Sequence, residues 1–415
     1  MLYILWDESH LWGLLAWRAA AAFQVPHRLV RCQDIAQGLL RRNPPNVLLV
    51  PGGVARRKAL ALGAPGMAAI QDYMEQGGTY VGFCGGSGLG LTGEYGLALC
   101  PWTRAAIGDR LLHLVSGHIH LHCQDDSAEH DLLPPDQPAE PLAPIWWPAR
   151  FAPSPSPDVD VLATYGMPGE DFWIADLPLS LLPLQAFGEW EQAYGISLRP
   201  DFLSGQPCVI HGKKGLGRYL LSYAHLETPA SPQANAWLAH LLEQLGRLAP
   251  ARRDVPAWDL EALPVRWDHP LLLRTREVLD ACLALGREHM LLFPRNEWLL
   301  GWRAGLPGSH LNHLNALTRH ALAGAPKNEA LRILETHQEA YLHNLEVLAR
   351  DLRGYLLAER LAMTLAKTVP DLVSQQALKA RREAIFGTGM EPGGCYAPLL
   401  QVLDEVACRV EPCAR

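Results

Sequence analysis

Residues 77–86 read Gly-Gly-Thr-Tyr-Val-Gly-Phe-Cys-Gly-Gly, in which a short apolar run leads into glycine-rich sequence. A strand that passes directly into a helix through Gly-x-Cys-x-Gly makes a tight, strained turn, called an elbow below. Its small flanking residues avoid clashes while the central side chain projects outward. The start of the following helix favours the thiolate form of that cysteine. We therefore expect Cys84 to be a nucleophile, the alternative being a buried cysteine on a glycine-rich turn.

Short apolar runs alternate with helical stretches through the first part of the chain. Such alternation predicts an α/β fold with an open, mostly parallel sheet flanked by helices. Asp7 and the Pro-Gly-Gly turn at residues 51–53 come just after two expected strands, and Cys84 follows a third. They therefore share the edge at which open α/β sheets form their sites. The expected strands are residues 3–6, 27–30, 47–50 and 80–83, and the expected helices are residues 11–23 and 66–76.

More strands are expected after the elbow, followed by an irregular excursion. Residues 176–206 contain prolines and aromatic residues without a regular period, so we expect them to pass over the site or to form a lid. The expected strands are residues 111–123, 159–165 and 172–175, with a hairpin of 207–211 and 218–222 around glycine-rich turns and a helix at 232–248.

A proline-containing stretch, residues 249–264, is expected to link the first domain, residues 1–248, to a helical domain at 265–415. Apolar residues in the second domain recur every three or four positions, which is typical of amphipathic helices. No repeat period stands out, so a single bundle is favoured over a solenoid. Its role is open between gating the site, self-association and docking a protein partner. The expected helices are residues 270–285, 308–323, 328–353, 355–368, 371–385 and 396–408.

The composition of the chain speaks against several classes of protein. With 415 residues, 49% of them hydrophobic and 19% charged, two packed domains are expected rather than one. A net charge of −7 without a basic run speaks against nucleic-acid binding. No apolar run approaches the roughly 18 residues that span a bilayer and no basic leader is visible, so we expect a cytoplasmic protein without membrane contact. The nine cysteines have no framework spacing and indicate reduced thiols.

A nucleophilic cysteine needs a base, and the base needs an orienting partner. His225 is the most suggestive histidine because it follows the expected strand 218–223 at the same edge of the sheet as Cys84. Glu227 lies two residues later. In extended chain a His-x-Glu pair points both side chains the same way, so the carboxylate can fix the imidazole tautomer. A surface turn with incidental polar residues is the alternative interpretation.

Three separated motifs, taken together, resemble the class I glutamine amidotransferase-like superfamily. They are the Cys84 elbow, the stretch 47–53 that ends in Pro-Gly-Gly, and the His-x-Glu pair at 225–227. Within that superfamily the sequence is most similar to the domain known as the biotin-protein ligase N-terminal domain. The resemblance covers about residues 1–248 and implies an amidotransferase- or flavodoxin-like sheet.

The resemblance also implies roles for individual residues. Cys84 would be the nucleophile, His225 the base and Glu227 the residue that orients the base, which makes a Cys-His-Glu triad. The backbone N–H groups of Gly53 and Gly85 would be the candidates for an oxyanion hole.

One position departs from the glutamine-hydrolysing members of the superfamily. These typically have a Gln four residues after the nucleophile that helps to hold the substrate, and this chain has Gly88 there. We therefore expect a cysteine hydrolase or amidotransferase that acts on an amide bond through a thioester, with an unidentified small-molecule or amide-containing substrate. No cofactor is expected, and no P-loop motif is present.

Two other functions remain open from the sequence. The first is a non-catalytic binding or scaffold protein that has kept the elbow but works through its helical domain. The second is a thiol stress protein of the DJ-1-like fold, which has the same kind of elbow but carries its supporting Glu before the elbow. The pair at residues 225–227 would then be unexplained.

A second polar cluster alternates along the expected strand at residues 116–123. His118, His120 and His122 share one face of that strand, a spacing that can bind Zn²⁺. Because no acidic or remote ligand can be identified, a polar strand face is favoured and no metal is expected.

The segment 145–151, Ile-Trp-Trp-Pro-Ala-Arg-Phe, occupies the place of a substrate-facing segment in the related domain. Packing is the favoured role of its two tryptophans, since large aromatic side chains usually fill cores. Trp147 and Arg150 are nevertheless candidates for substrate binding, Arg150 because it could face an anionic substrate. Gly52 in the Pro-Gly-Gly turn is a third candidate.

Overall fold

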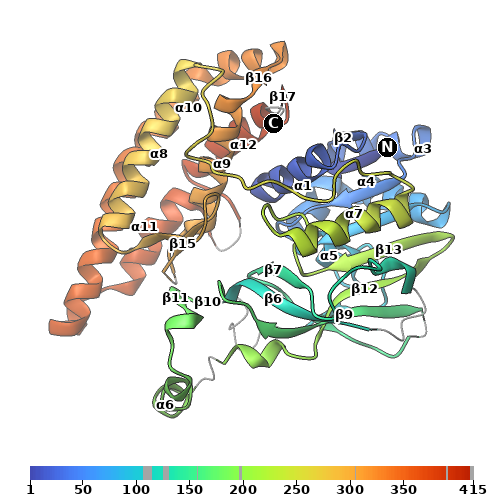
Figure 1. Ribbon diagram of the computed structural model, residues 1–415. Helices are drawn as coiled ribbons and strands as arrows, with labels where there is room; N and C mark the ends of the chain where they lie inside the picture. The colour runs from blue at the N-terminus through green and yellow to red at the C-terminus, as the bar shows by residue number, and fades with distance from the viewer. Residues whose placement is uncertain are drawn as a thin grey trace. The chain divides into compact units, whose positions relative to one another are not determined.

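The computed structural model describes residues 1–105, 115–124, 130–156, 158–195, 199–303, 305–388 and 391–411. The chain forms two compact units, Met1–Ala257 and Trp258–Arg415, which run from blue to yellow-green and from yellow to red in Figure 1. The boundary between them falls inside the stretch 249–264, where the sequence predicts a linker. In the described ranges, no helix is both long enough and apolar enough to cross a membrane.

The first unit is built on one large sheet with helices packed against it (Figure 1). The strands of this unit, in the large sheet and outside it, are β1 (Leu2–Leu5), β2 (His27–Val30), β3 (Val47–Val50), β4 (Thr79–Phe83), β5 (Thr103–Arg104), β6 (Val115–Cys123), β7 (Leu142–Trp146), β8 (Phe151–Ala152), β9 (Val159–Pro168), β10 (Trp173–Ile174), β11 (Leu177–Pro178), β12 (Pro207–Lys214) and β13 (Gly217–Ser222). Its helices are α1 (His10–Ala22), α2 (Cys32–Ala36), α3 (Leu39–Arg42), α4 (Ala55–Glu75), α5 (Gly85–Gly90), α6 (Leu184–Tyr194) and α7 (Pro232–Gly246), with 3-10 turns η2 (His130–Leu132), η3 (Leu179–Leu181) and η4 (Pro200–Leu203).

One half of the sheet is parallel, in the order β2-β1-β3-β4-β13. Every residue of β1, β3 and β4 is buried, as expected for parallel strands covered on both faces. Because these strands point the same way, the loops that follow β1, β3, β4 and β13 meet at one edge of the sheet. The predicted α/β class is confirmed, and this edge carries the candidate site.

The other half of the sheet is antiparallel and continues from β13 through β12, β9, β6, β10 and β11, with β7 paired to β6. This half is larger than the description "mostly parallel" anticipates, because a tight hairpin joins β12 to β13 and reverses the chain. The predicted strand 111–123 is present from Val115 onward, and residues 111–114 lie outside the described residues. The excursion at 176–206 contains β11, η3, α6 and η4.

The second unit is mainly helical, as predicted. In it α8 and α10 lie side by side, and α12 packs on α9 and α10 (Figure 1). Its elements are α8 (Pro270–Glu288), β14 (Leu292–Pro294), β15 (Leu300–Trp302), α9 (Gly308–Ala323), β16 (Ala325–Pro326), α10 (Asn328–Thr368), η5 (Pro370–Leu372), α11 (Gln375–Phe386), α12 (Tyr396–Ala407) and β17 (Val410–Glu411).

The predicted break between helices 328–353 and 355–368 is wrong, because α10 is one helix of 41 residues that runs through Gly354. A single glycine costs a helix only about 1 kcal/mol relative to alanine. Leu352, Tyr355 and Leu356 are buried on either side of Gly354, so packing outweighs that cost.

Replacing Gly354 with alanine should stabilise the protein. A Cβ built at Gly354 meets nothing within 4 Å, and alanine loses less backbone entropy on folding. We expect Gly354→Ala to raise the free energy of unfolding by about 0.5–1 kcal/mol. Urea unfolding followed by far-ultraviolet circular dichroism measures this change.

Gly387→Ala is the matched control with the opposite sign. Gly387 has φ +92° at the end of α11, and a Cβ there would lie 2.2 Å from the carbonyl oxygen of Glu391. This variant should be less stable than the unmodified chain. Equal effects of the two substitutions would contradict the open environment assigned to Gly354.

Candidate active site

Cys84 lies at the turn between β4 and α5 and is partly exposed. Its backbone has φ 47° and ψ −102°, a conformation that side-chain-bearing residues rarely adopt. Its N–H donates to the carbonyl oxygen of Ser222 in β13, at 2.8 Å. The elbow is therefore strained and is fixed to the neighbouring strand.

The glycines around Cys84 are required by close backbone packing. A Cβ on Gly82 would lie 2.7 Å from the carbonyl carbon of Gly86, and a Cβ on Gly86 would lie 1.9 Å from the carbonyl oxygen of Val50. Real Cβ atoms do not approach backbone this closely. The Gly-x-Cys-x-Gly pattern is thus explained by the close packing of α5 against both β4 and the end of β3.

Gly53 and Gly85, the two candidates for the oxyanion hole, lie against each other. A Cβ on Gly85 would lie 2.0 Å from the oxygen and 3.0 Å from the nitrogen of Gly53. Gly53 has φ +117°, which other residues rarely adopt. In the described part of the chain neither N–H group donates a hydrogen bond. Two unoccupied backbone donors therefore lie next to Cys84.

His225 and Glu227 form a fully buried pair. The Nδ1 atom of His225 lies 2.7 Å from Oε1 of Glu227, and both side chains are 0% exposed. A carboxylate only accepts, so Nδ1 carries the proton and donates it to Glu227. The other imidazole nitrogen, Nε2, is buried and makes no hydrogen bond of regular geometry with any described residue. The geometry leaves Nε2 free to accept a proton.

The charge of His225 is set by three competing effects. Burial acts to lower the pKa of the imidazole, but the Glu227 carboxylate and the Cys84 sulfur, which lies within reach of the ring, raise the pKa of His225 to about 10. The ring is therefore protonated near neutral pH. An imidazolium in this position can donate one hydrogen bond to the carboxylate and one toward the sulfur of Cys84.

Trp12, which the sequence analysis did not predict as part of the site, packs against the imidazole of His225. The indole of Trp12 and the imidazole of His225 have ring centroids 4.7 Å apart. Gly52 lies below both rings, since a Cβ there would be 2.9 Å from Trp12 and 3.1 Å from His225. Gly52 thus leaves room for the imidazole of His225, and a substrate contact at Gly52 stays a prediction. Helix α1 gives no sign of this role in its sequence, because Trp12 is one of many apolar residues in it.

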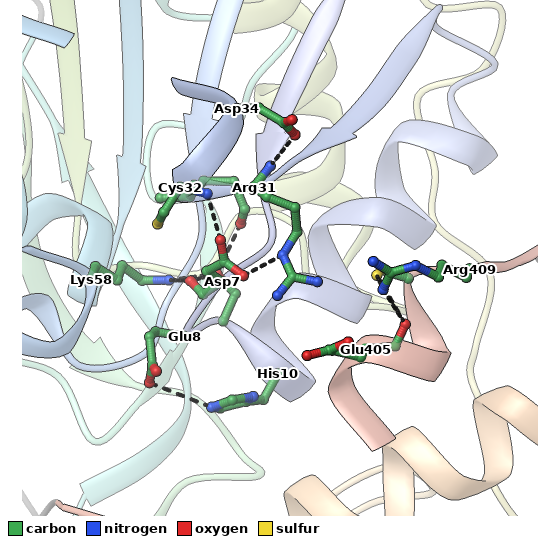
Figure 2. A network of polar contacts seen from close by, with 12 residues as sticks. Asp7, Glu8, His10, Arg31, Cys32, Asp34, Lys58, Glu405 and Arg409 are labelled. Atoms are coloured by element: carbon green, nitrogen blue, oxygen red, sulfur yellow. Dashed lines mark hydrogen bonds and ion pairs between the residues drawn. The ribbon is translucent and has the colours of Figure 1, made fainter. Parts of the chain in front are cut away.

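A second network of polar groups at the same edge supports the Pro-Gly-Gly turn (Figure 2). Lys58 is 0% exposed, and its ammonium donates to the hydroxyl of Ser9 and, at 3.3 Å, to the carbonyl oxygen of Asp7. The carboxylate of Asp7 in turn accepts from the side chain of Arg31 and the N–H of Cys32. Asp7, which the sequence placed at this edge, therefore belongs to the support of the site.

Glu8 connects this network to the oxyanion candidates. Its carboxylate accepts two hydrogen bonds from Arg57, at 2.6 and 2.8 Å. Burial acts to raise the pKa of Glu8, but His10 and Arg57 lower it to about 2, so Glu8 is ionised. Its carbonyl oxygen would lie 2.3 Å from a Cβ on Gly53. This contact holds Gly53 in its glycine-only conformation.

Two buried tyrosines, Tyr165 in β9 and Tyr223 just after β13, lie within electrostatic range of Cys84. Tyr165 is buried, which raises its pKa well above the usual value; Cys84 adds to this effect and Arg150 opposes it. Arg150 and Cys84 thus both lie within electrostatic range of Tyr165. The substrate-binding role of Arg150 stays a prediction. Tyr223 is likewise buried and influenced by Cys84.

The two tryptophans predicted to pack have different surroundings. Trp146 is 2% exposed and donates to the hydroxyl of Thr228 at 3.2 Å, as a core residue. Trp147 is partly exposed, has φ +52° and donates its N–H to the carbonyl oxygen of Val115. A substrate-binding role for Trp147 stays a prediction.

The three histidines of β6 do not converge on one point. His118 bonds to Asp171 and Ser231, His120 to the carbonyl oxygen of Glu140, and His122 to the Glu140 carboxylate. Among the described residues, no group of three or more His, Cys, Asp or Glu side chains is arranged to hold a metal ion. His118 thus has partners of its own, whereas His120 and His122 both contact Glu140, through its carbonyl oxygen and its carboxylate.

No model of a known protein family matches the sequence, and no curated protein matches it. Solved structures resemble part of the chain. A glutamine amidotransferase is 14% identical over 59% of this chain and 98% of that chain, with a TM-score of 0.37. A Thermoplasma acidophilum protein described as one of the subunits of GMP synthase is 9% identical over 60% and 94%, with a TM-score of 0.38. A β-galactosidase from Bacillus circulans is 13% identical over 60% and 31%, with a TM-score of 0.32. These likenesses concern the backbone, and any activity has to be argued from the site.

The imidazole of His225 should stay protonated far above the pH at which ordinary histidines lose their proton, because its pKa is about 10. Glu227→Gln removes the carboxylate but keeps the size of the side chain. Without the carboxylate, the effect of burial on His225 is no longer offset by Glu227, and the pKa of the imidazole should fall toward or below 6.5. Titration of the ¹⁵N-labelled imidazole by nuclear magnetic resonance measures both values.

The same shift links stability to pH. The pKa of His225 is higher in the folded state than in the unfolded state. The protonated imidazole therefore stabilises the fold fully below the unfolded pKa of 6.5, and this stabilisation is lost as pH rises toward about 10. The loss of unfolding free energy caused by Glu227→Gln should therefore shrink across this window. His120→Gln, on β6, is the control without such a trend. A pH-independent effect of Glu227→Gln would contradict a buried imidazolium–carboxylate pair.

Proposed function

We propose that the first unit is a cysteine hydrolase or amidotransferase that cleaves an amide bond through a Cys84–His225–Glu227 triad. The observation that carries this proposal is the buried His225–Glu227 pair, whose free Nε2 atom faces the Cys84 side of the imidazole. A surface turn with incidental polar residues would not bury both groups completely. The glycine-lined elbow and the two free N–H groups beside it supply the remaining parts of an acyl-transfer site.

The reaction follows from the positions of the groups. The Cys84 thiolate, with its proton held on His225, attacks the carbonyl carbon of the amide and forms a tetrahedral adduct. The N–H groups of Gly53 and Gly85 stabilise the negative charge on its oxygen. His225 gives its proton to the leaving nitrogen, the C–N bond breaks, and a thioester remains on Cys84. Water, or an amine acceptor, then releases the acyl group by the same steps in reverse order.

The substrate proposed here is an amide other than free glutamine. The position at which glutamine-hydrolysing relatives carry a Gln is Gly88, and a Cβ there would lie 3.3 Å from the Cβ of Ala55 at the start of α4. A side chain at this position would press on Ala55, and Gly88 itself offers no amide group for holding glutamine. The biotin-protein ligase N-terminal type of domain, which the sequence resembles, also lacks that Gln, so this departure favours it as the relevant relative.

The thiol itself provides a test that does not need the substrate. Iodoacetamide should alkylate Cys84 near neutral pH, and both His225→Ala and Glu227→Gln should slow that reaction by about tenfold or more, because the thiolate loses its imidazolium partner. Cys123 and Cys408, which are also partly exposed, serve as internal references in the same chain. Peptide mass spectrometry gives the rate at each cysteine.

Turnover is then measured as ammonia or amine release from a panel of small amides that includes glutamine. Cys84→Ala should abolish any turnover, and glutamine should be among the poorest substrates. Alkylation of Cys84 that does not respond to either substitution at 225 and 227 would show that the pair does not serve the thiol. That result would favour a scaffold function.

A further inference from the structure

A second constellation of nucleophile, base and acid lies apart from the Cys84 triad, in Ser231, His118 and Asp171. The hydroxyl of Ser231 is 2.8 Å from Nε2 of His118, and Nδ1 of the same ring is 2.8 Å from a carboxylate oxygen of Asp171. The other carboxylate oxygen of Asp171 accepts from the backbone N–H of His118, also at 2.8 Å. Asp171 therefore fixes both the position and the orientation of the ring.

The direction of each hydrogen bond follows from the chemistry of the groups. An ionised carboxylate only accepts, so Nδ1 of His118 carries the proton. In the neutral imidazole Nε2 is then an acceptor, and Ser231 must donate its hydroxyl proton to it. This is the arrangement that activates a serine for attack. We propose that Ser231 is the nucleophile of a second acyl-transfer site, with His118 as base and Asp171 as the residue that orients it.

The fold holds Asp171 against His118 by close backbone contacts. Gly117 has φ +132°, and a Cβ there would lie 2.7 Å from the Cα of Phe172 and 2.8 Å from the carbonyl oxygen of Asp171. Gly169 donates its N–H to the carbonyl oxygen of His118 at 2.8 Å. The turn before β10 can therefore lie directly on β6, and the carboxylate meets the ring as a consequence.

Ser231 is held in place from the other side of the site. It is the residue before α7, it follows Ala230 with φ +55°, and its side chain does not cap the helix. Its hydroxyl faces His118 and makes only a long contact, 3.4 Å, with the carbonyl oxygen of Pro229. In the described part of the chain the N–H groups of Gln233 and Ala234 donate no hydrogen bond. The first turn of α7 thus offers free donors next to the serine for a developing oxyanion.

The solvent exposure of the three side chains limits the size of the substrate that can reach Ser231. Ser231 is 2% exposed, whereas the side chains of His118 and Asp171 are 24% and 49% exposed. Because the hydroxyl is almost fully covered, we expect only a small acyl group to reach it. An ester of a small carboxylic acid fits this description, because its alkoxide leaves readily and its carbonyl is narrow.

The proposed reaction balances with water as the only co-reactant. Oγ of Ser231 bonds to the ester carbonyl carbon while Nε2 of His118 takes the hydroxyl proton. The bond from that carbon to the alcohol oxygen then breaks, and His118 returns the proton to the leaving alcohol. Solvent water attacks the acyl-serine in the same way, which releases the carboxylic acid and restores the hydroxyl of Ser231.

A small alkyl fluorophosphonate tests the site, because an activated serine displaces its fluoride and keeps the phosphonyl group. The experiment uses the full chain with Cys84→Ala, so that no adduct arises from the elbow thiol. Peptide mass spectrometry should find the adduct on Ser231. His118→Asn should slow labelling by about 10²-fold or more, and Asp171→Asn should slow it as well. His120→Asn, on the same strand, is the matched control and should label at the unmodified rate.

Asp171→Asn also guards against a folding artefact, since Asp171 is half exposed and the substitution keeps its size. Circular dichroism confirms that each variant is folded. An unlabelled Ser231 in the folded Cys84→Ala chain would overturn the proposal, and so would equal labelling of the His118→Asn and His120→Asn variants. Neither result bears on the Cys84 triad, which is tested by its own alkylation rates.

Discussion

The close approach of two backbone turns is the constraint on which the site depends. The Pro-Gly-Gly turn after β3 and the elbow after β4 touch where neither carries a Cβ, and an added methyl group on Gly85 or Gly86 would overlap backbone oxygen at about 2 Å. This contact sets the conformation of Cys84 and brings two free N–H groups together. It also explains why residues 51–53 and 82–86 are rich in glycine, since any side chain would push the strands apart.

Buried charge is the second constraint at this edge of the sheet. The His225–Glu227 pair and the ammonium of Lys58 are fully removed from solvent, and burying a charge costs several kcal/mol unless partners compensate for it. Oε2 of Glu227 finds no partner among the described residues, so compensation there is incomplete. A fold optimised for stability alone would place apolar groups at these positions. The cost is consistent with selection for chemistry.

Much of the fold could be predicted from the sequence because local signals and tertiary packing agree. The strands at residues 27–30 and 47–50 and the helix at 308–323 begin and end where their patterns indicate. The elbow and the His-x-Glu pair were found because each motif is compact in sequence. Trp12 could not be found, since its contact with His225 joins residues more than 200 positions apart. Ser231 and Asp171 are equally hidden, because only the fold brings the start of α7 and the turn before β10 to His118 and shows which serine and which acid flank it.

The connection from His225 to Ser231 carries the base proposed for one site and the nucleophile proposed for the other. Its middle is fixed by Asn235, whose side-chain amide donates to the carbonyl oxygens of Leu226 and Thr228. The same side chain therefore holds the whole loop that leads from His225 to the start of α7, so the positions of the imidazole and of the serine hydroxyl both depend on Asn235.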